Sequence, residues 1–308
     1  MSDDTPPPRL AIVGVTASGK STLAMALARQ HREIELVSVD SMQIYRGMDI
    51  GTAKPSAAER AEVPHHLIDL VDPCDAFTVA EFQRAAESAL TGIEARGGVP
   101  VLVGGTGLHL RAVVDALELP GQFPGVVADL ESEPDTEALH RRLQTLDPLA
   151  ASRMEPSNRR RVLRALEVTV GSGRAFSSYG PGLDTYGPTR FTMIGPRWPR
   201  AAVDERIAAR YRKQIADGFV EEVARLAADP RGLSHTAGQA LGYRQLLEHV
   251  AGRQTLEEAV EDAVAATRRF ARRQERWFRR DPRVRWIDVA DNPMEASAAV
   301  MGEYRSCT

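Results

Sequence analysis

The sequence predicts an α/β fold, in which helices flank a parallel sheet and a small all-helical insertion interrupts it. Three observations predict this fold. Short apolar runs alternate with amphipathic stretches over the first hundred residues. A glycine-rich turn directly follows the first apolar run. After residue 116 the composition shifts toward proline, glycine and acidic residues, which is typical of a boundary between structural units.

The N-terminal elements follow from hydrophobic periodicity. Residues 10–15, LAIVGV, form a short apolar run of the kind found in buried parallel strands. Leucines and alanines then recur at helical spacing, so a helix begins near Ser18. LVSVD at 36–40 and VPVLVGG at 99–105 predict two further strands, and an amphipathic stretch at 77–90 predicts a helix between them.

The second half of the chain is predicted to be mostly helical. Residues 120–136 indicate a linker or loop, two helical patterns follow at 136–146 and 159–170, and turn-forming residues at 171–188 indicate another loop. An apolar run at 191–196 returns to the sheet. The predicted organisation is a flexible leader at residues 1–8, a two-part core at 9–116 and 189–290 with a helical C-terminal region, and a helical insertion at 117–188.

Composition excludes several classes of protein. The 308 residues are 43% hydrophobic and 26% charged, which excludes disordered and collagen-like chains. Two distant cysteines, Cys74 and Cys307, provide no framework for disulfides or zinc. Because no secretory signal and no run of 18 apolar residues occur, we expect a cytoplasmic protein without membrane contact.

Charge is unevenly distributed along the chain. A net charge of −3 argues against a protein that coats nucleic acid by bulk charge. Residues 268–285, however, contain nine arginines and only two acidic residues. A second cluster comprises Arg159, Arg160, Arg161 and Arg164. Such an excess suits contacts with phosphates, whereas Phe270 and Trp277 on the same amphipathic stretch are more readily explained as core.

A phosphate-binding loop carries the clearest chemistry. Residues 14–21, GVTASGKS, match GxxxxGK[ST] between a strand and a helix, the context that this P-loop motif requires. Glycines allow the backbone N–H groups to face phosphate oxygens, Lys20 reaches the terminal phosphate, and Ser21 can hold Mg²⁺. The candidate phosphate-binding residues are Gly14, Thr16, Ala17, Ser18, Gly19, Lys20 and Ser21.

Two further strand ends bear polar residues. Asp40 ends the second predicted strand, where P-loop enzymes often place a magnesium-holding acid. The third strand ends instead in Gly104-Gly105-Thr106-Gly107, and ligands bind at this edge of a parallel sheet. From the residues alone, Asp40 can hold magnesium or cap a helix, and Thr106 can be a helix cap. A small-molecule kinase therefore stays open at this point.

Seven segments together resemble the tRNA dimethylallyltransferase family, the bacterial tRNA isopentenylation enzymes. They occur in the family's order over residues 9–288 and read GVTASGKS, VDSMQIYRGMDIGTAKP, PHHLIDLVDP, VLVGGTGLHL, RRVLRALEV, QALGYR and TRRFARRQERWFRR. The resemblance implies transfer of a dimethylallyl group from its diphosphate to the exocyclic amine of the adenosine at tRNA position 37. It also implies an enzyme that uses Mg²⁺ and binds the anticodon stem-loop. We expect this enzyme to be a monomer.

The resemblance assigns roles to individual residues. Asp40 would accept a hydrogen bond from the attacking amine and Thr106 would act at the reacting end. Arg206 and Arg210, four residues apart on one predicted helix face, would bind the diphosphate, with Arg206 also catalytic; solvent exposure is their alternative explanation. The implied tRNA contacts are Asp40, Ser41, Met42, Gln43, Thr106, Arg159, Arg160, Arg161, Gln239, Gly242, Tyr243, Arg244, Arg268, Arg272, Gln274 and Arg276.

Some positions keep alternatives open or depart from the family pattern. Tyr243 can stack on a base or belong to the core. His65 and His66 are predicted to be structural because a third metal ligand is lacking nearby. His109 stands where the family often has tyrosine, and residues 118–135 form a shorter segment than usual.

Three other functions compete with this interpretation. An adenylate isopentenyltransferase would not need the arginine-rich segment or QALGYR, because a free nucleotide requires no such surface. A small-molecule kinase fits poorly with the GGTG strand end. A non-catalytic RNA-binding module leaves the phosphate loop unexplained.

Overall fold

The larger of two compact units contains a six-stranded parallel sheet. The computed structural model describes residues 9–307, of which residues 9–115 and 188–307 form the larger unit and residues 116–187 the smaller. The strand order is β3-β2-β4-β1-β5-β6, and every pairing is parallel, which confirms the predicted α/β class. The strands are β1 (Arg9–Val13), β2 (Ile34–Val39), β3 (His65–His66), β4 (Val99–Gly104), β5 (Phe191–Arg197) and β6 (Val284–Asp288).

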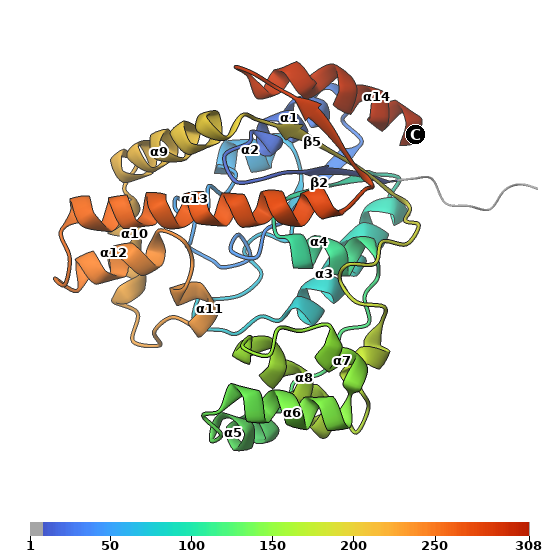
Figure 1. The fold of residues 1–308 in the computed structure, drawn as a ribbon. Helices are drawn as coiled ribbons and strands as arrows, with labels where there is room; N and C mark the ends of the chain where they lie inside the picture. The colour runs from blue at the N-terminus through green and yellow to red at the C-terminus, as the bar shows by residue number, and fades with distance from the viewer. Residues whose placement is uncertain (1–8, 308) are drawn as a thin grey trace, which may run out of the picture. The chain divides into compact units, whose positions relative to one another are not determined.

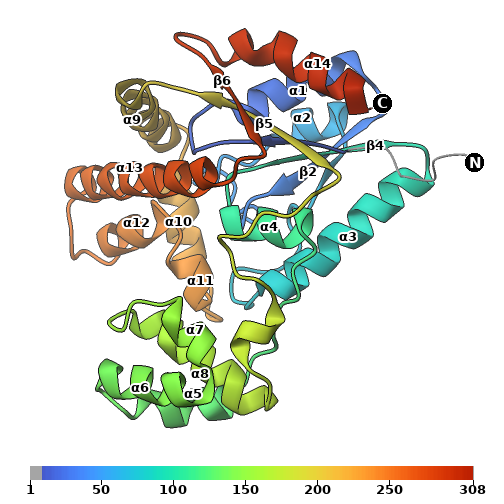
Figure 2. The ribbon, with the colours of Figure 1, turned by 45° about the vertical axis from the view of Figure 1, so that its right-hand side comes forward.

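Helices cover both faces of this sheet (Figure 1 and Figure 2). On one face lie α1 (Lys20–Gln30) and α14 (Ser297–Cys307), and on the other α3 (Val79–Ala95) and α4 (Gly107–Val114). The central strands alternate between these layers: Leu10 and Ile12 face the α1 side, whereas Ala11 and Val13 face the α3 side. Both faces are buried, which explains why these strands are continuous apolar runs.

The C-terminal helices extend the core on the α4 side. They are α9 (Arg200–Ala216), α10 (Phe219–Ala227), α11 (His235–Gly238), α12 (Tyr243–Val250) and α13 (Leu256–Arg280). Thr255 and Glu258 start α13 with reciprocal side-chain caps. This helix of 25 residues packs along α9, α12 and α4, so its N-terminal acidic end and arginine-rich end belong to one continuous element (Figure 1).

The smaller unit, residues 116–187, is entirely helical. Its helices α5 (Pro124–Glu131), α6 (Thr136–Leu146), α7 (Pro148–Ser152) and α8 (Arg159–Ser172), with the short 3₁₀ helix η1 (Phe176–Tyr179), enclose their own apolar cluster. Leu143 and Leu166 are fully buried within it. The helical patterns at 136–146 and 159–170 thus correspond to α6 and α8.

Several predicted boundaries require correction. Residues 120–136 are not all loop, because α5 starts at Pro124, a residue suited to a first helical turn. Strands β3 and β6 went unpredicted since two and five residues at a sheet edge carry little periodicity. The core also extends beyond residue 290, because Val300 and Tyr304 of α14 are buried against α1 and the sheet. The remaining helix, α2, spans Ala57–Glu62. The predicted leader, residues 1–8, lies outside the described residues.

None of the helices in residues 9–307 is both long enough and apolar enough to cross a membrane.

Candidate active site

Three strand ends meet at the carboxyl edge of the sheet. Because β1, β4 and β2 are neighbours, the phosphate loop after β1, Asp40 after β2 and the glycine-rich turn after β4 lie beside one another. Ligands of open parallel sheets bind at this edge. The structure therefore brings together the strand-end residues that the sequence singled out.

Two side chains from outside the phosphate loop, Trp198 and Arg206, bond to its backbone carbonyls. Trp198, just after β5, donates its indole N–H to the Ser18 carbonyl at 2.8 Å. Arg206 stacks on the Trp198 ring, 4.3 Å from its centroid, and donates from Nε to the Ala17 carbonyl at 2.7 Å. A trans peptide points its N–H opposite to its C=O, so fixing the Ser18 carbonyl orients the Gly19 N–H toward the other side. α1 begins at Lys20, whose first-turn N–H groups lack intrahelical partners.

Lys20 lies within the loop and is surrounded by charge. Its ammonium donates to the Val15 carbonyl at 3.3 Å. Burial lowers the pKa of Lys20 to about 8, although the negative charge of Asp40 counteracts this effect and Arg210 adds to it. Lys20, Asp40 and Arg210 therefore interact electrostatically, and a bound anion would further stabilise the protonated form of the lysine.

Arg210 and Gln274 fix Thr16 from two helices. Arg210 of α9 donates to the Thr16 hydroxyl at 3.0 Å and to the Gly51 carbonyl at 3.1 Å. Gln274 of α13 accepts from the Thr16 N–H at 2.9 Å and donates to the Gly105 carbonyl at 2.8 Å. One amide thus joins the phosphate loop to the end of β4.

Asp40 and Thr106 follow the ends of the neighbouring strands β2 and β4. The Asp40 carboxylate accepts from the Met42 N–H at 2.9 Å, forming a turn that is stabilised by its own side chain. Thr106 starts α4, but its hydroxyl makes no capping bond and instead accepts from the Ser41 N–H at 3.2 Å. Neither residue is the simple helix cap that the sequence left open.

His109 lies one turn into α4 near Asp40. Its ring meets Phe82 edge to face, with centroids 4.8 Å apart. Among the residues described, 9–307, nothing bonds to its buried Nδ1 atom. Burial lowers the pKa of His109 to about 4, against the opposing influence of Asp40, so the imidazole is neutral at physiological pH.

The glycines of the β4 turn permit close approach of α13. A Cβ on Gly107 would lie 2.3 Å from Trp277 Nε1, and a Cβ on Gly105 would lie 2.7 Å from both Gln274 Nε2 and the Gly14 carbonyl. Side chains at these positions are therefore excluded. Trp277 packs on this turn, in agreement with its interpretation as core.

Burial overturns two of the predicted tRNA contacts. Tyr243 is 1% exposed, packs edge to face on Phe219 and donates its hydroxyl to Glu222, so its prediction as a stacking residue is wrong. Gln274 is 7% exposed and uses both ends of its amide within the protein, so it positions the loop and does not reach RNA. Gly242 is buried beside Tyr243, and a Cβ there would meet the Phe219 ring.

Members of the predicted tRNA surface that are at least partly exposed lie on two segments. Gln239 and Arg244 are exposed at the α11–α12 turn. On α13, Arg268 is tied to the Asp204 carbonyl at 3.1 Å, whereas Arg272 and Arg276 make no hydrogen bond or ion pair with any residue from 9 to 307. The latter two guanidinium groups are available for an anionic partner.

The residues after β2 that were predicted to contact tRNA differ in how far they are engaged within the protein. The Gln43 amide accepts from the Ser38 hydroxyl at 2.7 Å and donates to the Thr52 and Ala53 carbonyls, so it organises this segment. Ser41 and Met42 are half-buried.

In the smaller unit, the arginine cluster divides into two kinds. Arg159 donates to the carbonyls of Glu131, Glu133 and Pro134 and thus closes the segment between α5 and α6. Arg160 and Arg161 are exposed.

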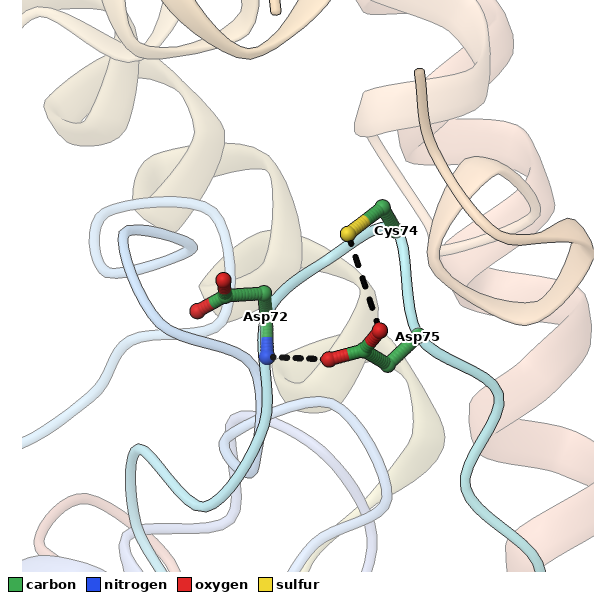
Figure 3. A group of neighbouring side chains, drawn as sticks. All are labelled: Asp72, Cys74 and Asp75. Carbon is green, nitrogen blue, oxygen red and sulfur yellow. Dashed lines mark hydrogen bonds between the residues drawn. The ribbon is translucent and has the colours of Figure 1, made fainter. Parts of the chain in front are cut away.

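The donors beside the phosphate loop suit Mg²⁺. Ser21 offers a hydroxyl from the exposed first turn of α1, and Asp40 offers a carboxylate, both hard oxygen ligands. A different group, Asp72, Cys74 and Asp75, gathers three potential ligands (Figure 3). Asp72 is neutralised there by Arg46 and Arg231 at 3.0 and 2.8 Å, which leaves little charge for a cation. His66 likewise pairs with Glu35 at 2.6 Å, consistent with a structural role.

Sequence reasoning missed Trp198, Gln214 and Glu222. Trp198 follows a strand at the carboxyl edge, and this position was the available signal. Glu222 stands beside one other acid, Glu221, in FVEEVARLA, where no pattern separates a buried carboxylate from a solvated one. Gln214 had no signal, since its role depends on contact with the distant residues Ile50 and Gly51.

The fold and the site define a P-loop protein in which a phosphate-binding turn faces a carboxylate and a glycine-rich strand end. Among known families, the sequence model described as IPP transferase matches residues 43–281, and that described as isopentenyl transferase matches residues 9–69. The chain belongs to the IPP transferase family, as the seven segments predicted.

Relatives named tRNA dimethylallyltransferase match almost the whole chain. The protein from Nocardioides sp. (strain JS614) is 48% identical, with 92% of each chain covered. That from Streptomyces coelicolor is 49% identical, with 94% of each chain covered. Among solved structures, the tRNA isopentenylpyrophosphate transferase of Bacillus halodurans has a TM-score of 0.71 at 37% identity and covers 97% of this chain and 95% of its own. A eukaryotic dimethylallyltransferase, at 23% identity and a TM-score of 0.80 over 97% of this chain and 79% of its own, shares the fold.

Proposed function

We propose that this protein transfers a dimethylallyl group from dimethylallyl diphosphate to the exocyclic amine of adenosine 37 in tRNA, releasing diphosphate. Membership in the family makes the chain a prenyltransferase that modifies tRNA. The observation that carries the finer proposal is the convergence of a phosphate loop, a carboxylate and a glycine-rich turn at one sheet edge. A monomer in the cytoplasm, where tRNA resides, is part of the proposal.

The leaving diphosphate would be stabilised by positive charge. Lys20, Arg210 and Arg206 surround the phosphate loop, and the first-turn N–H groups of α1 add hydrogen-bond donors. Charge that develops on the departing oxygen is stabilised by such preorganised groups without further rearrangement. Mg²⁺, held by Ser21 and Asp40, would neutralise further phosphate charge.

Asp40 would assist the incoming amine. An adenine amine is a weak nucleophile because its lone pair is delocalised into the ring. A carboxylate that accepts its hydrogen bond during attack raises the rate, typically by about 100-fold or more. The turn through Met42 fixes this carboxylate. The Thr106 hydroxyl, on the adjacent strand end, would contact the base or the diphosphate.

Partly or fully exposed arginines would hold the anticodon stem-loop. Extruding a stacked base costs a few kcal/mol, which contacts to the surrounding backbone must offset. The residues proposed for these contacts in the larger unit are Arg272 and Arg276 on α13, with Gln239 and Arg244 at the α11–α12 turn. In the insertion they are Arg160 and Arg161. This RNA surface favours tRNA over a free nucleotide as the acceptor.

The primary experiment supplies three acceptors in parallel. Enzyme, Mg²⁺ and dimethylallyl diphosphate are mixed with an unmodified anticodon stem-loop, with AMP or with ATP, and digested products are weighed by mass spectrometry. We expect the dimethylallyl mass on adenosine 37 of the stem-loop alone. A gain on AMP or ATP alone would reassign the acceptor to free nucleotides, and a γ-phosphate lost from ATP without any prenylation would favour the kinase.

Asp40→Asn should lower kcat by about 100-fold or more, because the amide cannot accept the proton that the carboxylate accepts. Asparagine retains the oxygen that bonds the Met42 N–H, so the turn and the tRNA affinity should persist. Turnover is measured with saturating substrates, and tRNA affinity by filter binding. Recovery of activity at high Mg²⁺ would indicate a purely metal-holding role, and normal turnover would remove Asp40 from the mechanism.

Arg272→Glu combined with Arg276→Glu should weaken stem-loop binding at least tenfold and reduce its salt dependence, since phosphate contacts release counterions. KM for dimethylallyl diphosphate should change less than twofold. The matched control is Arg32→Glu combined with Arg305→Glu, which makes the same total charge change at two exposed arginines outside α13. Equal loss of binding in the control would show a bulk-charge effect, and unchanged binding in the double variant would exclude α13 from the RNA surface.

The pH profile should report Lys20. The protonated ammonium attracts the diphosphate, so kcat/KM for the donor should decline as pH rises through about 8, the pKa of this lysine. In Lys20→Arg, whose guanidinium keeps its proton, the remaining activity should lack this decline. A decline near pH 8 that persists in the variant would assign it to another group.

A further inference from the structure

A buried carboxylate outside the strand-end site organises the segment that follows β2. Glu222 of α10 is 2% exposed. Its Oε2 atom accepts from the backbone N–H groups of Asp49 and Ile50 at 3.0 and 2.8 Å. Its Oε1 atom accepts from the Gly51 N–H at 3.2 Å and from the Tyr243 hydroxyl at 2.5 Å. Four donors thus converge on one side chain.

The other side of this backbone segment faces the phosphate loop. The Gly51 carbonyl accepts from Arg210 at 3.1 Å and from the Gln214 amide at 3.1 Å. Arg210 then reaches the Thr16 hydroxyl at 3.0 Å. Glu222 is therefore linked to the phosphate loop through one residue of backbone and one guanidinium group.

Packing leaves no room for a side chain at Gly51. A Cβ at this residue would lie 2.3 Å from two Phe219 ring carbons and 2.4 Å from Tyr243 Cε2. The rings thus press on one side of the glycine while Glu222 holds its N–H. Because its carbonyl orientation depends on these contacts, the direction of the Arg210 side chain depends on them as well.

Tyr243 connects the same carboxylate to the α11–α12 turn. Burial, reinforced by the neighbouring charge of Glu222, raises the pKa of Tyr243, so its hydroxyl keeps its proton and donates. Arg244 is the next residue and is exposed. The turn proposed to contact RNA is consequently anchored to the group that fixes Gly51.

We propose that Glu222 is a positioning residue for donor binding: it fixes the Gly51 backbone so that Arg210 is directed onto the phosphate loop. This inference rests on the proposed function, since the donor is dimethylallyl diphosphate. A buried carboxylate that joins four donors is costly to alter, because any neutral replacement leaves at least one donor unsatisfied. In Glu222→Gln, the NH2 part of the amide faces either the N–H groups of Asp49 and Ile50 or the N–H group of Gly51. Two donors that face each other make no hydrogen bond.

The test separates donor binding from RNA binding. In Glu222→Gln, kcat/KM for dimethylallyl diphosphate should fall about tenfold, in line with the loss of one charge-assisted hydrogen bond. KM for the stem-loop should remain within twofold, because the Tyr243 hydroxyl can donate to the glutamine oxygen or accept from its NH2 group, which keeps the α11–α12 turn anchored. The matched control, Glu221→Gln, alters the exposed neighbour on the same helix and should behave as wild type. Unchanged donor kinetics in Glu222→Gln, with active wild-type enzyme, would overturn the positioning role alone.

A double-mutant cycle tests whether Arg210 carries the effect. If Glu222 acts through Arg210, Glu222→Gln should reduce donor kcat/KM less than twofold in an Arg210→Ala background. A full tenfold reduction in that background would overturn the proposal. If Glu222→Gln fails to fold, Tyr243→Phe replaces it. Loss of this one hydrogen-bond donor should reduce kcat/KM for dimethylallyl diphosphate by a smaller factor, and this reduction should again disappear in the Arg210→Ala background. Additive losses would contradict an effect of Glu222 through Arg210. Inactive wild-type enzyme would contradict the proposed function instead.

Discussion

The close contact between α13 and the glycine-rich end of β4 is the constraint on which the site depends. Only because Gly105 and Gly107 lack side chains can Gln274 and Trp277 reach this turn. Gln274 then bonds the phosphate loop on one side and β4 on the other. The loop geometry is thus set by a helix more than 250 residues away in sequence, and a short motif functions only inside this tertiary frame.

Electrostatics at the sheet edge follows from the same packing. Lys20 and Arg210 are buried near each other, which by itself disfavours their charged forms, and Asp40 partly offsets this for both. A bound anion stabilises the charged forms of Lys20 and Arg210, because it supplies the negative charge that Asp40 provides only in part. Phosphate affinity and the unfavourable charge balance of the free enzyme therefore have a common origin.

Much of this arrangement could be predicted from the sequence. The strand-loop-helix context of GVTASGKS located the phosphate loop, and apolar runs located four of the six strands. Family segments led to the membership that the relatives confirm. Side-chain burial could not be predicted in the same way: an aromatic residue at a turn and an amide on an arginine-rich helix look exposed in sequence, yet Tyr243 and Gln274 are buried. Their partners, Glu222 and Thr16, are distant in the chain, and no local pattern encodes such a contact.

The order of strands along the chain has a consequence for biosynthesis. β1 pairs with β4 on one side and with β5 on the other, and β5 begins only at Phe191, after the whole helical insertion. While the ribosome is still making the insertion, one edge of β1 has no partner strand, and its apolar side chains lack the cover of α14. Unpaired strand edges promote association between nascent chains. The insertion encloses its own core and can therefore complete its folding during this interval. The sheet of the larger unit stays incomplete until β5 and the elements after it emerge.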